Sequence, residues 1–177
     1  MRAACAGAGL IEVLVALLVL TVGGLGMLAL QSRAVQNTQE ATLQGNAVML
    51  AHDLLEMMRS NRDAVLDATG QLDGVSSYFK AERAAFPAIP TNCGTRERGS
   101  GGDEVAAADL GCWRGRIERL LPVTPGILTN DFAVCRSASD ETCSDAGSLV
   151  MIRVAWADER SKMCDGGVCS YVLRAEL

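Results

Sequence analysis

The chain has 177 residues, and its 16 basic and 21 acidic side chains give a formal net charge of -5. This length predicts one compact domain with an appendage rather than two domains. The acidic balance, without a Lys/Arg cluster, excludes the usual phosphate-binding surface, so we expect no nucleic-acid partner. The sequence has no G-x-S-x-G, no H-E-x-x-H and no Cys close to a His. We therefore expect neither an enzyme nor a cofactor.

The first thirty residues predict a membrane-length helix. Residues 13–30 form a run of 18 residues without a charge, which as a helix spans about 27 Å, close to the hydrocarbon thickness. Arg2 and the free amino terminus orient the leader toward the cytoplasm. A cleaved secretory signal is the alternative, but the apolar run is longer than a typical signal core. A carboxylate at the membrane edge, here Glu12, implies a cationic partner.

The stretch GAGLIEVLVALLVL resembles the class III signal of type IV prepilins, in which a short leader ends in Gly and Glu is the fifth residue after the cut. The resemblance implies that a prepilin peptidase cuts between Gly7 and Ala8 and methylates the new terminus at Ala8. It also implies that Glu12 meets the N-terminal amine of a neighbouring subunit during assembly. The family most often has Phe and Thr where this chain has Ala8 and Gly9.

Beyond the apolar run, an amphipathic pattern predicts that the helix continues. No Pro occurs before Phe86, so we expect one continuous helix to about Arg62, with its C-terminal half on a core. His52, the single histidine, lies beside the apolar stripe and is expected to be a surface or packing residue, not a metal ligand. The stripe recurs at spacings of three and four residues, at Leu43, Ala47, Leu50, Leu54 and Met57.

Residues 46–65, NAVMLAHDLLEMMRSNRDAV, resemble the PilV-type minor pilins, also called type IV pilus modification proteins. In that family a similar helix ends near an M-R-x-N-R motif, here residues 58–62. An A-A-A-D-L-x-x-W arrangement, here residues 106–113, also recurs there. The resemblance implies an α+β, type IV pilin-like fold, in which a long N-terminal helix packs on a small antiparallel sheet.

The rest of the chain predicts a globular head. Turn formers in residues 67–102 predict a long, partly ordered connection. Residues 103–121 predict a second helix with Asp103 as a possible N-cap, Pro122 just beyond, and Trp113 as a core anchor. Alternating residues in FAVCR, LVMIRVAW and CSYVLRAEL predict three strands in an antiparallel meander.

Six of the seven cysteines follow the apolar segment, which suggests disulfides in an oxidising compartment. Cys164 and Cys169 flank a hairpin tip. By the same reasoning Cys135 pairs with Cys143, which leaves Cys93 for Cys112. This set is a preferred guess, because sequence alone permits other pairings.

Two metal sites are disfavoured. None of the cysteine spacings is C-x-x-C, which argues against zinc. The acidic residues Asp140, Glu141 and Asp145 could form a Ca²⁺ loop but lack the D-x-D-x-D-G order, so solvated hairpin charge is the preferred interpretation.

These patterns predict four segments: a leader (1–7), a transmembrane or filament-core helix (8–30), its amphipathic continuation (31–66) and the head (67–177). The resemblance implies a minor pilin that primes or joins a type IV pilus, with roles in twitching motility and cell adhesion. The implied partners are prepilin peptidase, the major pilin, other minor pilins and the inner-membrane assembly platform.

The implied location is the inner membrane, with the head in the periplasm, and later the pilus fibre or tip. One alternative is a minor pseudopilin of a type II secretion system. Another is a membrane-anchored binding module or adhesin with an uncleaved signal anchor. A thiol oxidoreductase would require a reactive thiol of low pKa.

Overall fold

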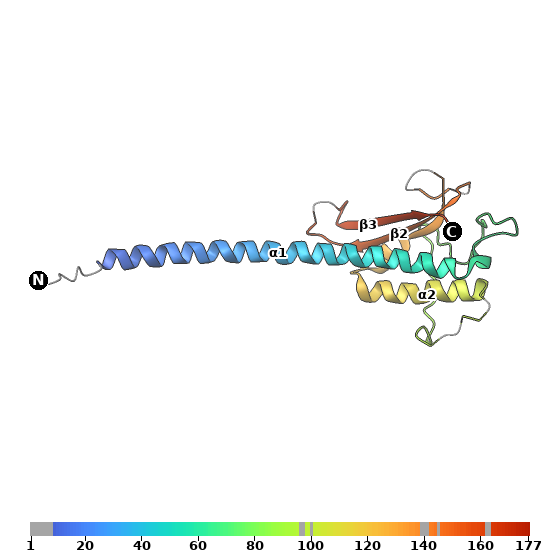
Figure 1. Ribbon diagram of the computed structural model, residues 1–177, viewed down its shortest axis with the longest axis horizontal. Coiled ribbons are helices and arrows are strands. Elements are labelled where there is room, and N and C mark those ends of the chain that lie inside the picture. The colour runs from blue at the N-terminus through green and yellow to red at the C-terminus, as the bar shows by residue number, and fades with distance from the viewer. Residues whose placement is uncertain (1–8, 96–97, 100, 139–141, 145, 162–163) are drawn as a thin grey trace, which may run out of the picture. The chain divides into compact units, whose positions relative to one another are not determined.

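The computed structural model describes residues 9–95, 98–99, 101–138, 142–144, 146–161 and 164–177. Its chain divides into two compact units, Met1–Ala41 and Thr42–Leu177, and each is described by itself. The elements in chain order are α1 (Leu10–Arg59), a 3₁₀ turn (Arg62–Ala64), α2 (Asp103–Leu120), α3 (Pro125–Asn130), β1 (Ala133–Ser137), β2 (Leu149–Ala157) and β3 (Val168–Ala175) (Figure 1).

The first unit contains the N-terminal part of α1. Every residue from 9 to 39 is exposed. Within the described residues, α1 is the one helix long and apolar enough to cross a membrane, with a mean hydropathy of 2.6 over its most apolar window. Exposed leucines and valines along such a length are stable only against lipid or other apolar helices.

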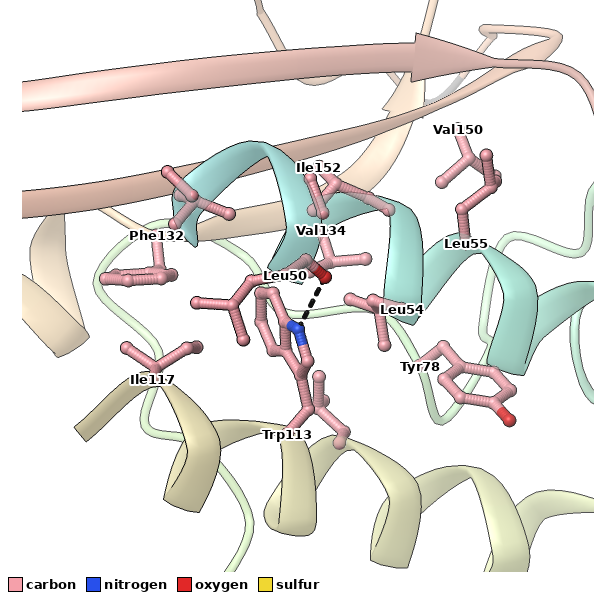
Figure 2. Packing of buried hydrophobic residues seen from close by; sticks show 14 of the residues in the cluster. Leu50, Leu54, Leu55, Tyr78, Trp113, Ile117, Phe132, Val134, Val150 and Ile152 are labelled. Carbon is pink, nitrogen blue, oxygen red and sulfur yellow. Dashed lines mark hydrogen bonds between the residues drawn. The ribbon is translucent and has the colours of Figure 1, made fainter. Parts of the chain in front are cut away.

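In the second unit, the C-terminal part of α1 lies between the sheet and α2 (Figures 1 and 2). Ala47, Leu50 and Leu54 of the predicted stripe are fully buried, whereas Leu43 and Met57 are only partly buried. Three further residues of α1, Ala51, Leu55 and Met58, are also buried. The buried face is therefore wider than one stripe, because α1 is covered on two sides.

The sheet is an antiparallel meander in the order β1-β2-β3, as the alternating pattern predicts. Val134 pairs with Ile152, and Ile152 with Leu173, so apolar side chains line one face. The last residue of β2, Ala157, pairs with the first residue of β3, Val168. The turn from Asp165 to Val168 therefore lies at the β3 end of the connection between the two strands. The predicted α+β arrangement of a long helix, a small antiparallel sheet and a further helix is confirmed.

The helices of the head differ from the prediction in two places. Asp103 is the first residue of α2 and Gly102 is the N-cap, with φ 95°, so the capping role predicted for Asp103 is wrong. The short helix α3 is not predicted by the sequence pattern. Thr124 caps it by accepting a hydrogen bond from the Ile127 N–H at 3.2 Å, and Pro125 occupies its first position.

Trp113 joins α2 to α1, as the prediction of a core anchor requires. Its side chain is fully buried, and its indole Nε1–H donates to the Leu50 carbonyl at 2.8 Å (Figure 2). The ring also packs against Phe86 and Phe132, with centroids 6.0 and 6.1 Å away. This satisfied hydrogen bond lets the large ring fill the interface without an unpaired donor.

The irregular chain before α2 packs closely against that helix at Gly111. A Cβ built on Gly111 would lie 2.4 Å from the Ala88 carbonyl oxygen and 3.0 Å from Pro90 Cδ. A contact with a backbone atom at that distance cannot be relieved by a side-chain rotation. Gly111 is therefore required for the approach of residues 88–90 to α2.

We predict that Gly111→Ala lowers the free energy of unfolding of the head by about 1–3 kcal/mol, because overpacking a close contact costs that much. Gly45→Ala is the matched control, since its Cβ meets nothing within 4 Å on α1. It should raise the stability by about 0.5–1 kcal/mol through helix propensity. Denaturant unfolding followed by tryptophan fluorescence measures both, and equal effects of the two variants would contradict the close contact.

Candidate functional site

The N-terminal part of α1 carries the first candidate site. Glu12 lies in the first turn of the helix, where a carboxylate interacts favourably with the helix dipole. The apolar residues around it are widely exposed, including Leu10 at 86% and Ile11 at 74%. An ionised carboxylate on such a surface requires a cation when the surface is transferred to lipid or packed against another helix. Gly7 and Ala8, the predicted processing residues, lie outside the described residues.

In the head, Asn61 connects the end of α1 to the start of α2. Its side-chain oxygen accepts from the Gly102 N–H at 2.7 Å, and its amide donates to the Gly102 carbonyl at 3.0 Å. The same amide lies 3.3 Å from the Tyr78 hydroxyl. A Cβ at Gly101 would lie 2.3 Å from the Asn61 side-chain oxygen, so this pairing also requires a glycine there.

Asp109 is the buried charge of this region. Its side chain is 3% exposed, and one oxygen accepts from Arg98 at 2.6 Å and from the Tyr78 hydroxyl at 2.7 Å. Arg98 also donates to the Met57 carbonyl at 3.0 Å and to the Ser60 hydroxyl. One guanidinium therefore connects the irregular chain before α2 to both α1 and α2.

The protonation states of this cluster favour its hydrogen bonds. Burial, together with the hydrogen bond to Asp109, raises the pKa of Tyr78 to about 12, so the phenol stays a donor at neutral pH. Burial lowers the pKa of Arg98, but the hydrogen bond and charge of Asp109 outweigh this and raise it. The arrangement surrounds the buried carboxylate of Asp109 with a cation and a hydrogen-bond donor.

Lys80 is a buried cation held by carbonyl groups. Its side chain is 2% exposed. The ammonium donates to the carbonyls of Phe132 at 2.8 Å, Thr129 at 3.0 Å and Ala81 at 3.3 Å, and lies 5.0 Å from the Phe86 ring centre. Burial lowers the pKa of Lys80 to about 8, although the charges of Glu82 and Asp131 raise it in part. Lys80 thus ties the chain before α2 to the junction between α3 and β1.

The described residues contain three disulfides. They join Cys93 to Cys112, Cys135 to Cys143, and Cys164 to Cys169, with Cα–Cα distances of 5.5, 5.6 and 4.5 Å. The first connects the irregular chain before α2 to α2 itself. The second connects β1 to the chain that follows it, and the third lies beside the turn before β3. The structure therefore brings the six cysteines together only in pairs.

The described residues contain no group of three or more His, Cys, Asp or Glu side chains that could hold a metal ion. His52 is exposed on α1. Asp140, Glu141 and Asp145, which were considered for calcium, lie outside the described residues.

The sequence patterns marked two residues of the polar cluster that Asn61, Tyr78, Arg98 and Asp109 form in the head. Asn61 and Asp109 belong to the two patterns that carry the resemblance, and the structure brings both patterns to one cluster. Tyr78, Lys80 and Arg98 were missed, because they lie in the irregular connection, where no periodicity marks a buried side chain.

Comparison with known families gives one result. Residues 29–100 match a family model, Tt1218-like, described as Type IV pilin Tt1218. The match supports a type IV pilin. It extends from the end of the apolar run of α1 through Asn61, Tyr78 and Arg98. The chain has a long N-terminal helix on a three-stranded antiparallel sheet with further helices, which is consistent with a type IV pilin fold.

No curated protein and no solved structure matches the chain. The family match over residues 29–100 is therefore the finding that supports a role as a type IV pilin subunit.

The lowered pKa of Lys80 makes stability depend on pH. Between pH 8 and about 10.5 the unfolded chain holds a proton that the folded head has begun to release, so unfolding becomes less favourable as pH rises. At about 1.4 kcal/mol per pKa unit, the gain is up to about 3 kcal/mol. Lys80→Met should lose this dependence in denaturant titrations from pH 7 to 10, and parallel curves for the two proteins would contradict it.

Proposed function

We propose that this chain is a minor pilin of the PilV type, which primes or joins the assembly of a type IV pilus. The observation that carries the proposal is Glu12, a single carboxylate in the first turn of an exposed, membrane-length apolar helix. The family match over residues 29–100 supports the coarser assignment to the type IV pilins from another part of the chain. The M-R-x-N-R and D-L-x-x-W patterns favour the PilV type.

The proposed mechanism is assembly rather than turnover. Residues 1–7 form the leader, and prepilin peptidase removes them on the cytoplasmic side and methylates Ala8. Residues 8–30 hold the subunit in the inner membrane, while residues 31–66 connect this helix to the head (67–177) in the periplasm. The subunit then leaves the membrane for the fibre or its tip, where apolar helices of neighbouring subunits replace lipid around it.

Charge pairing provides the reason for Glu12 in this mechanism. A carboxylate in an apolar environment is costly unless a cation neutralises it. The amine of Ala8 on a neighbouring subunit is the proposed cation. A subunit inserted out of register would leave both charges unpaired, so the pair would also select the correct register.

A minor pseudopilin of a type II secretion system is the second candidate, since it would share the N-terminal chemistry. An anchored binding module with an uncleaved signal is the third. The first experiment below separates the third candidate from the other two, and the second tests the role in the filament.

The first prediction concerns processing. In cells with prepilin peptidase, the N-terminal residue of the membrane-extracted protein should be a methylated Ala8, and in cells without it Met1 should remain. Removal of the leader also removes Cys5, the odd cysteine, and leaves six cysteines. Because these form three disulfides, the non-reduced mass should be lower by six hydrogens than the reduced mass. An intact Met1 in both strains, or a cut after Gly26, would exclude pilin-type processing.

The second prediction concerns assembly. In Glu12→Ala, leader cleavage should persist while the amount in sheared filaments falls more than about tenfold, because truncating one partner of a desolvated ion pair costs about 2 kcal/mol or more. Glu40→Ala is the matched control, a glutamate on α1 outside the apolar run, and should assemble normally. Normal incorporation of Glu12→Ala would refute the pairing role.

A further inference from the structure

We propose that the Cys93–Cys112 disulfide and the Arg98–Asp109 ion pair form cooperatively, so that oxidation of this one cysteine pair stabilises the ion pair and the ion pair favours the disulfide. The inference does not depend on the proposed function, because it concerns contacts inside the head.

The two links lie next to each other on α2. Cys112 follows Asp109 by three positions, which places both side chains on one face of the helix. Cys93 and Arg98 both belong to the irregular chain before α2. A pocket of about 210 Å³ is lined by these four residues among others. The disulfide and the ion pair thus attach the same stretch of chain to the same helix turn.

Closing either link shortens the loop that the other has to close. The cysteines have a sequence separation of 19, but α2 already fixes Cys112. Without the ion pair, the path from Cys93 to the helix runs to Asp103, its first residue, and with it the path runs only to Arg98, which is half as long. Halving a loop favours closure by about threefold, even for a flexible chain.

Arg98 needs this support because no regular element holds its backbone. It belongs to neither a helix nor a strand, and the chain from Thr91 to Thr95 is exposed. Asp109 is 3% exposed, so its carboxylate is costly to leave without a cation. By linkage, a disulfide that favours the ion pair must be favoured by it to the same extent.

The pairing step requires an oxidant. An oxidant that itself carries a disulfide accepts two electrons and two protons from the thiols of Cys93 and Cys112. One S–S bond forms between the cysteines, and the S–S bond of the oxidant breaks to give two thiols. The residue Cys93 is exposed, so this exchange can begin at the surface of the folded head.

The test measures the disulfide equilibrium of the full chain in detergent micelles. The protein is equilibrated in glutathione redox buffers, quenched with acid, alkylated and mapped by mass spectrometry. Arg98→Met should lower the equilibrium constant for forming Cys93–Cys112 by about three- to tenfold, from the loop-closure effect alone to a moderate coupling between sites. Cys135–Cys143, which closes a separation of 8 elsewhere in the head, should be unchanged and is the internal control.

Arg114→Met is the matched control variant. Arg114 also lies on α2 and forms an ion pair, with Glu118 at 3.0 Å, but that pair is partly exposed and lies on the helix itself. Neither disulfide should change in this variant. An unchanged constant for Cys93–Cys112 in Arg98→Met would overturn the proposal, and so would an equal decrease for both disulfides, which indicates general destabilisation.

The reciprocal measurement is made in the Cys93→Ser/Cys112→Ser background. There Arg98→Met should shift the urea midpoint less than it does in the otherwise unmodified protein, whereas the Cys135→Ser/Cys143→Ser background should retain the full shift. If Arg98→Met does not fold, Arg98→Lys replaces it in both experiments. A decrease confined to Cys93–Cys112 in that variant supports the coupling, and unchanged constants refute it.

Discussion

The burial of α1 on two sides is the constraint on which the head depends. A helix packed between a sheet and a second helix must be apolar over most of its circumference, which explains why Ala51, Leu55 and Met58 are buried beside the simple stripe. Trp113 provides the main contact on the α2 side. Because its indole N–H is satisfied by the Leu50 carbonyl, the ring can fill that interface at little polar cost.

The second constraint is that a largely irregular stretch, residues 65–102, must cross the outside of this core. Its regular backbone pairing is confined to isolated bridges such as that of Lys80 with Val134, so specific side chains also hold it. Lys80 donates to three carbonyls, Asn61 pairs with both backbone groups of Gly102, and Arg98 neutralises Asp109. These polar groups buried in the head thus fix the path of the chain.

The two units meet different physical demands along one continuous helix. In the first unit, exposed apolar residues require lipid or other helices, and the carboxylate of Glu12 is costly to place in such surroundings without a cation. In the second, the helix is part of a core that the chain supplies itself. A structural subunit fits this division, because the part that requires partners and the part that folds on its own contacts are separate along the chain.

The sequence by itself determined the elements that depend on local pattern. Periodicity predicted the extent of α1 to within a few residues, the position of α2 and the three strands, because a buried face repeats at the period of its element. The segment around Glu12 was marked by composition alone. The sequence did not reveal Tyr78, Lys80 and Arg98, nor the cap at Gly102. Their burial and partners arise where distant segments meet, and only the tertiary structure decided which carbonyl, carboxylate or glycine each side chain reaches.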